Sequence, residues 1–247
     1  MSKRTRLDIL TAVAFLTKRV LKPQRDDYDK LIRMVQYVRG TRHMCITFEV
    51  SEPIHVIAYI DSSFAIHPDM KSHTGCVITL EKGAIYAKSG TQRLMTKSST
   101  AAELAALSDA SNQVLWTRNF LERQGHPQPP ALIYQDNQST IQLMRNGRSN
   151  SERTPHIDIR YFILHDRITT GAIDIVYLPT TDMIVDILTK PLQGELFKKL
   201  RKELLNTTPP TLTYAEGCKT EDRTDSAPTP VRTKSNPRFP YPTSKKN

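Results

Sequence analysis

Cysteine is scarce in this chain of 247 residues, which has three, at positions 45, 76 and 218. An odd number of cysteines without a CxxC spacing argues against a disulfide framework or a zinc site, and it is typical of reduced thiols in the cytosol or nucleus. Long apolar runs are missing too, and none approaches the roughly 20 residues of a membrane span. We therefore expect a protein of the cytoplasm or nucleus, not secreted and without a membrane partner.

Acidic residues are outnumbered. The chain has 35 Lys and Arg against 25 Asp and Glu, a net charge of +10 and a pI near 9.6. Such an excess favours an anionic partner, and nucleic acid is preferred to a membrane surface because no apolar run could span a bilayer. The basic and apolar start of the chain is reminiscent of a targeting segment. Asp8 interrupts it, however, and helical spacing of the apolar residues favours an amphipathic helix of the folded body.

Periodic patterns divide the chain into three zones. Residues 1–50 contain two predicted helices, at 7–21 and 28–40, the second ending at Gly40. Residues 51–205 alternate between strand and helix, with strands expected at 54–61, 75–80, 84–88, 131–136 and 172–178, and helices at 98–124, 138–145, 156–168, 181–189 and 193–205. This order predicts an α/β fold with a mixed five-stranded sheet and helices on both faces. Residues 206–247, rich in Thr, Pro, Ser and Lys, are expected to form a disordered basic tail.

Carboxylates end two of the expected strands. Asp61 follows the apolar run VIAYI, and Asp136 follows ALIYQ. The simplest explanation of each is a turn or a helix cap, because Asp bonds readily to the backbone ahead of it. Open α/β sheets also place ligands at the carboxyl ends of their strands, where both acids lie if the two strands run parallel. The two acids are therefore candidates for one site.

Two further acids are close enough in the predicted fold to join them. Glu103 fits a capping box with Thr100, but it also extends the apolar stripe of its helix by one turn and would then point inward. Asp186 shares a helix face with Asp182 and other polar residues, so a solvated face would explain it; its place after the last strand still brings it near the same edge. Several carboxylates at one edge describe a site for a hard divalent cation.

The order Asp61, Glu103, Asp136, Asp186 is carried by the motifs AYIDSSFAIHPDMKSHTG, KSSTAAELAALSDA, IYQDNQSTI and YLPTTDMIVDILTKPL. With these motifs, about residues 54–205 resemble the ribonuclease H domain of copia-type retrotransposon polyproteins. The stretch DILTAVAFLTKRVLKPQRDDYDKLIRMVQYVRGT is similar to the end of the reverse transcriptase that precedes that domain. The resemblance implies a ribonuclease H-like fold for 51–205 and a helical remnant of the polymerase for 1–50.

The resemblance also implies a chemistry. The four acids would be catalytic and would bind two Mg²⁺ ions, with Mn²⁺ as a substitute and no small-molecule cofactor, for hydrolysis of the RNA strand of RNA/DNA hybrids. Asp61 would bridge the ions, Glu103 and Asp136 would flank them, and Asp186 would be the outermost ligand. A reverse transcriptase polymerase domain is a further expected partner, in a cytoplasmic virus-like particle or the nucleus.

Two departures from the family accompany this reading. Ala101 stands where the family usually has a glutamate, a change that metal binding should tolerate. The segment YLPTTDMIVD lacks the histidine that cellular ribonucleases H carry before the last acid, so product release or proton delivery is expected to be slower. The polymerase motif Tyr-x-Asp-Asp is absent, since YIDS has one acid.

A basic stretch, AKSGTQRLMTKSST, precedes Glu103. Its polar side chains are either an ordinary solvated loop or contacts to the phosphates of a hybrid, and the candidates for the second role are Lys88, Gln92, Arg93 and Lys97. Two other function classes stay open: a catalytically inactive nucleic-acid-binding relic, and an integrase-like enzyme. The presence of all four acids disfavours the first, and the position of Glu103 on the first long helix disfavours the second.

Overall fold

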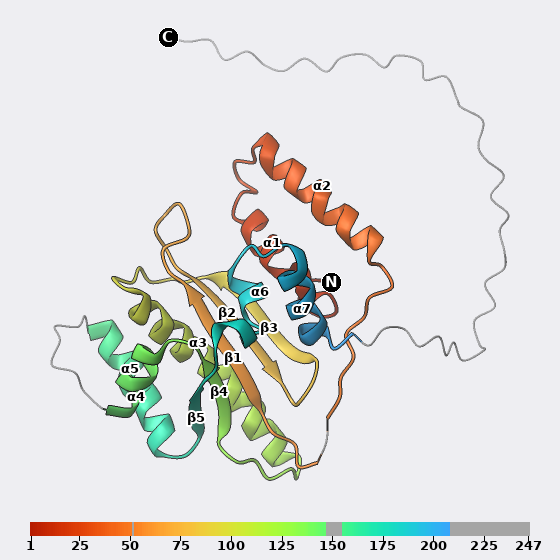
Figure 1. Ribbon diagram of the computed structural model, residues 1–247. Coiled ribbons are helices and arrows are strands. Elements are labelled where there is room, and N and C mark those ends of the chain that lie inside the picture. The colour runs from red at the N-terminus through yellow and green to blue at the C-terminus, as the bar shows by residue number, and fades with distance from the viewer. Residues whose placement is uncertain (51, 147–154, 208–247) are drawn as a thin grey trace, which may run out of the picture. The chain divides into compact units, whose positions relative to one another are not determined.

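The structure, a computed structural model, describes residues 1–50, 52–146 and 155–207 and contains a five-stranded sheet of order β3-β2-β1-β4-β5 (Figure 1). The strands are β1 (Ile57–Ser63), β2 (His73–Thr79), β3 (Ala84–Thr91), β4 (Ala131–Gln135) and β5 (Ile173–Tyr177). β1, β2 and β3 pair antiparallel, whereas β4 runs parallel to both β1 and β5. The predicted mixed five-stranded sheet is therefore confirmed.

Helices cover both faces of this sheet. Successive side chains of a strand point to opposite faces, so Ile60 and Ile78 enter one core while Val77 enters another. The first core is closed by α3 (Ser99–Arg123), α4 (Gln138–Asn146) and α5 (Pro155–Thr169), and the second by α1 (Leu10–Thr17), α6 (Asp186–Thr189) and α7 (Gly194–Leu205). No helix in the described ranges is both long enough and apolar enough to cross a membrane.

β1 begins and ends later in the chain than expected, and this changes the setting of Asp61. The strand continues to Ser63, which pairs with His73 of β2, so the expected end of the strand at Asp61 and the turn that would explain this acid are wrong. The backbone of these residues is used by the antiparallel ladder instead. The parallel pairing with β4 covers only Ile57 to Tyr59. Asp61 therefore lies inside β1 but beyond the end of its contact with β4.

Three helix boundaries also differ from expectation. The predicted helix at 181–189 is wrong: the segment holds a 3₁₀ turn, η2 (Thr180–Asp182), and the four-residue α6. Met183 and Val185 between them are fully buried, so packing into the second core replaces the helical pattern. At the N-terminus a 3₁₀ turn, η1 (Leu7–Ile9), leads into α1, which stops at Thr17. α2 (Arg25–Gly40) begins earlier than the expected residue 28, and it ends at Gly40 with Thr41 as its C-cap.

A buried ion pair within the N-terminal segment is linked to α7 through Tyr37. Arg6 donates to Asp8 through Nε at 3.0 Å and Nη2 at 2.9 Å, and both side chains are almost fully buried. The hydroxyl of Tyr37 on α2 donates to Asp8 Oδ2 at 2.5 Å, and Arg201 on α7 donates to that hydroxyl at 2.9 Å. The domain boundaries at 50/51 and 205/206 stay a prediction, and the tail predicted to be disordered lies outside the described residues from 208 onward.

Replacing Asp8 tests how far the N-terminal segment depends on this contact. Asp8→Asn leaves the Arg6 guanidinium without its counter-charge in a buried position, which typically costs about 3 kcal/mol. We expect a corresponding fall in the free energy of unfolding, measured by urea denaturation of the full chain. Asp26→Asn is the matched control, because Asp26 forms an exposed pair with Lys30 worth less than about 1 kcal/mol. If the two substitutions lowered the free energy of unfolding equally, the buried contact of Asp8 would not be a main source of stability.

Candidate active site

Asp61 and Glu103 lie on neighbouring elements, and both are buried. Glu103 sits one turn into α3, where Oε1 accepts from the Ser62 amide at 3.2 Å and Oε2 accepts from Gln135 Nε2 at 3.2 Å. The cap of α3 is Ser98, whose hydroxyl accepts from the amide of Ala101. The capping-box explanation of Glu103 is therefore wrong. Its carboxylate points to the edge where β1 runs past β4.

Asp136 directly follows β4 and is held by a hydroxyl. Thr180 Oγ1 donates to Asp136 Oδ2 at 2.8 Å. The helix-cap role belongs instead to the next residue, Asn137, whose Oδ1 accepts from the Thr140 amide at 3.0 Å. Asp136 is thus half-buried at the carboxyl end of β4 without capping α4.

Asp186 is the first residue of α6 and is only 5% exposed. The explanation that it belongs to a solvated helix face is therefore wrong. Thr189, at the end of α6, donates from Oγ1 to Asp61 Oδ2 at 2.6 Å. The next residue, Lys190, places Nζ 2.8 Å from Asp186 Oδ1 and 3.9 Å from Asp61 Oδ2. α6 and the residue after it therefore bring a carboxylate, a hydroxyl and an ammonium group to Asp61 of β1.

A glycine lets α6 come this close. Gly75 on β2 is the partner of Asp61 in the antiparallel ladder. A Cβ atom at Gly75 would lie 2.6 Å from Thr189 Cγ2 and 2.8 Å from Val185 Cγ2. Any side chain at this position would displace α6, so Gly75 determines the approach of the helix to the site.

Three residues near the acids were not among the sequence candidates. Gln135 is fully buried and accepts from the amides of Asp136 and Asn137 at 2.8 and 3.0 Å while donating to Glu103. Thr189 and Lys190 are the other polar residues of the helix face expected for Asp182 and Asp186. All three lie inside the motifs that carry the family resemblance, which was the signal available.

The four acids influence one another electrostatically. Burial raises the pKa of Glu103 well above its usual value, and Asp61 and Asp136 add to the shift. Burial likewise raises the pKa of Asp186 to about 6, in spite of its hydrogen bond from Lys190. Burial opposes the charge on Lys190, but Asp61 and Asp186 raise its pKa on balance. Lys190 thus interacts with three of the four carboxylates, Asp61, Asp136 and Asp186, and negative charge is in excess.

This excess of carboxylates has the donor chemistry that a hard divalent cation prefers. Among the described residues, however, no three His, Cys, Asp or Glu side chains are placed so as to hold a metal ion together. The hydrogen bonds explain this arrangement. Asp61 is turned to Thr189, Asp136 to Thr180 and Asp186 to Lys190. The residues fit Mg²⁺ by type, and binding requires these carboxylates to exchange their internal partners.

The basic stretch before α3 divides into exposed and buried residues. Lys88, Arg93 and Lys97 are exposed and free to meet phosphates. Gln92 is only 4% exposed, and its Nε2 donates to Thr74 Oγ1 at 3.0 Å and to the Ala102 carbonyl at 2.9 Å. The expectation that Gln92 contacts nucleic acid is therefore corrected, because its donors already tie the loop to β2 and α3.

Comparison with curated proteins finds similarity to transposon polyproteins. The chain is 32% identical over 202 residues to the retrovirus-related Pol polyprotein from transposon TNT 1-94 of Nicotiana tabacum, 29% over 202 residues to that from transposon RE2 of Arabidopsis thaliana, and 25% over 206 residues to the transposon Ty1-JR1 Gag-Pol polyprotein of Saccharomyces cerevisiae. Each match covers 81% of this chain but only 12 to 15% of the relative. No family model matches.

Similar solved structures include LC11-RNase H1 in complex with RNA/DNA hybrid, at 18% identity and a TM-score of 0.42, covering 54% of this chain and 92% of that one. Another is the foamy viral protease-reverse transcriptase in complex with RNA/DNA hybrid, at 17% identity and a TM-score of 0.38. That match covers 66% of this chain and 26% of the viral protein.

The raised pKa of Glu103 predicts how its replacement affects stability. A carboxyl group with a raised pKa in the folded state supports folding fully below its ordinary pKa, and that support is lost as the pH rises through the folded-state pKa. Glu103→Gln removes the charge. Without divalent cations, we expect the Tm of this variant relative to wild type to rise by about 2–4 °C between about pH 4 and pH 8.

Glu122→Gln controls for this change, because Glu122 lies on the exposed face of the same helix. Its Tm difference from wild type should stay flat over the same range. A flat difference for Glu103→Gln as well, measured by differential scanning calorimetry, would show that the Glu103 carboxylate is not destabilised by its neighbours.

Proposed function

Because this chain is homologous to the Pol polyproteins of copia-type retrotransposons over about four-fifths of its length, we propose that residues 51–205 are a metal-dependent ribonuclease H that hydrolyses the RNA strand of RNA/DNA hybrids. The chain spans less than one-fifth of those relatives, so other activities of the whole polyproteins are not assigned to it. The supporting observation is the cluster of four carboxylates, in which burial and like charge raise the pKa of two members.

The four acids would hold two Mg²⁺ ions, with Mn²⁺ as a substitute. When bound, such ions lower the pKa of an attacking water and stabilise the charge on the leaving 3′ oxygen. Asp61 is the candidate for a shared ligand, because it interacts with both Glu103 and Asp186. Asp136 contributes from the end of β4, and Asp186 is the most replaceable ligand because it stands on a four-residue helix.

Two neutral residues position these acids. Gln135 uses one buried amide to orient Glu103 and to fix the turn in which Asp136 lies. The hydroxyl of Thr189 orients Asp61 from the opposite side. Both groups are fully buried, so their geometry is held by packing rather than by solvent. They keep the carboxylates near one another in spite of their repulsion.

Substrate would approach along the exposed basic side chains Lys88, Arg93 and Lys97. Contacts from such residues to phosphates position a duplex without reading its sequence. The RNA strand would be identified by its 2′-hydroxyls in the wide minor groove of the hybrid. A separate polymerase domain is a further proposed partner, as the names of the relatives suggest.

Replacing the acids tests the catalytic proposal. Asp61→Asn should abolish Mg²⁺-dependent cleavage of a labelled RNA/DNA hybrid, because an amide cannot supply the charge that two cations share. Glu103→Gln and Asp136→Asn should do the same. Asp186→Asn should leave measurable cleavage, most of all with Mn²⁺. Asp182→Asn, an exposed aspartate four residues away, should match wild type.

The inactive alternative makes a different prediction for the same proteins. A nucleic-acid-binding relic would cleave no hybrid with either metal, and it would bind hybrid equally well with and without Asp61→Asn. Binding is measured by fluorescence anisotropy of a labelled hybrid. That combined result would replace the catalytic proposal with the relic.

The basic residues are tested through the salt dependence of binding. Each phosphate contact contributes about −0.7 to −0.9 to the slope of log K against log salt. The double variant Arg93→Gln/Lys97→Gln should weaken binding to hybrid of any sequence and flatten the slope by up to about 1.8. Lys82→Gln is the control, since Lys82 pairs with Glu49 at the other end of the β2–β3 hairpin. An unchanged slope in the double variant would place the duplex elsewhere.

A further inference from the structure

Lys190 stands between two of the candidate metal ligands. It follows α6, where the chain becomes extended with φ −123° and ψ 145°. Its amide donates to the Asp186 carbonyl at 3.0 Å, which anchors the start of the side chain. Its Nζ then lies 2.8 Å from Asp186 Oδ1 and 3.9 Å from Asp61 Oδ2. A positive charge thus already occupies the space that these two carboxylates face.

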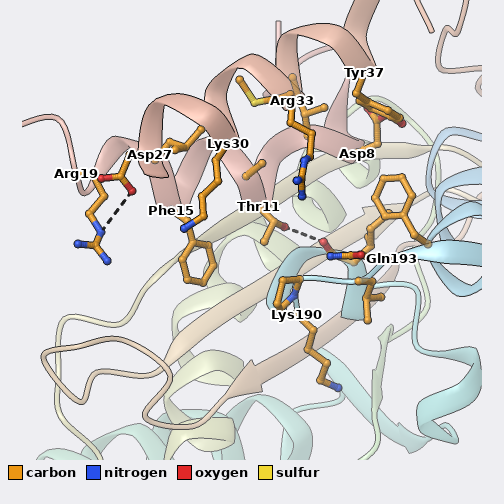
Figure 2. A pocket seen from close by; sticks show the side chains of 18 residues that line it. Asp8, Thr11, Phe15, Arg19, Asp27, Lys30, Arg33, Tyr37, Lys190 and Gln193 are labelled. Atoms are coloured by element: carbon orange, nitrogen blue, oxygen red, sulfur yellow. Dashed lines mark hydrogen bonds and ion pairs between the residues drawn. The ribbon is translucent and has the colours of Figure 1, made fainter. Parts of the chain in front are cut away.

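The surroundings of Lys190 leave room for its ammonium group to move away from the two carboxylates. The side chain is 37% exposed, so one side of it meets solvent. Lys190 also lines a largely apolar pocket of about 560 Å³ formed by α1, α2 and residues 187–197. In Figure 2 its nitrogen points away from α2. The ion pair can therefore open by rotation of one long side chain, without movement of α6.

We infer that Lys190 is a tethered counter-ion, which neutralises Asp61 and Asp186 in the metal-free protein and competes with a divalent cation for them. The inference rests on the proposed function, because it takes these acids to be metal ligands. Buried carboxylates without a partner are destabilising, so the lysine stabilises the metal-free state. Cation binding must displace it, and the Mg²⁺ concentration at which the cluster fills is raised accordingly.

Lys190→Met removes the charge and keeps much of the apolar stem. In the full chain, titrated with MgCl₂ alone by isothermal calorimetry, we expect the Kd for Mg²⁺ to fall by at least about threefold, as for loss of a partly buried ion pair. The Tm without divalent cations should fall, and the gain in Tm on adding Mg²⁺ should be larger than in wild type.

Two variants serve as controls. Lys199→Met removes the same charge from an exposed pair with Asp182, 3.3 Å apart, and should leave the Kd for Mg²⁺ within error of wild type. Lys190→Arg keeps a cation at the site and should keep the affinity near that of wild type. An equal gain in affinity in Lys190→Met and Lys199→Met would reduce the effect to net charge and overturn the inference.

The possible results separate the two proposals. If wild type binds Mg²⁺ and Asp61→Asn does not, but Lys190→Met binds with unchanged or weaker affinity, the counter-ion inference fails and the metal site stands. If wild type does not bind Mg²⁺, or if Asp61→Asn binds it equally well, the proposed metal site is contradicted, and the inference about Lys190 is contradicted as well.

A measurement on wild type avoids any folding defect of the variant. The rate at which an acylating reagent labels Lys190, followed by peptide mass spectrometry and normalised to Lys199, reports how free its ammonium group is. Saturating Mg²⁺ should increase this rate by at least about threefold, because the amine leaves its ion pairs. An unchanged or slower rate, with Mg²⁺ binding verified in the same sample, would overturn the inference.

Discussion

Repulsion among buried carboxylates is the constraint that organises this molecule. Asp61, Glu103, Asp136 and Asp186 come from separate parts of the chain, and Asp61 and Asp136 lie close enough to Glu103 and Asp186 to help raise the pKa values of those two. The fold offsets the repulsion with donors placed on each acid: an amide for Glu103, hydroxyls for Asp61 and Asp136, and an ammonium for Asp186. The result is a cluster of carboxylates in which each acid accepts a hydrogen bond from a donor of the protein itself.

The sheet supplies the rigid frame for this cluster. β1 pairs with β2 along its whole length but with β4 only at its start, so Asp61 projects into the space beyond the end of β4. The first core packs α3 against one face of the sheet, and the second core packs α6 against the other. As a result, Glu103 of α3 and Thr189 of α6 both lie near Asp61. Because Gly75 has no side chain, α6 can lie directly on β2.

The N-terminal segment connects to this frame through the second core rather than through the site. Leu7 and Leu10 pack with Leu200 and Leu204 of α7, and the buried pair of Arg6 and Asp8 adds a polar contact. The same segment and α2 form the pocket whose edge includes Lys190. The N-terminal segment and Lys190 thus line the same pocket.

The sequence by itself determined the basic character, the five strands, the long helix ending near Gly125 and the order of the four acids, because these depend on local pattern and residue type. It did not decide whether Glu103 caps its helix or belongs to the site. The sequence pattern also placed the end of β1 too early and did not show that Gln92 is buried. Those questions depend on partners far away in the chain: Glu103 meets Gln135 32 residues on, and Asp61 meets Thr189 128 residues on. Only the tertiary structure brings such residues together, because burial and the direction of a side chain are decided by packing between elements rather than by neighbours in sequence.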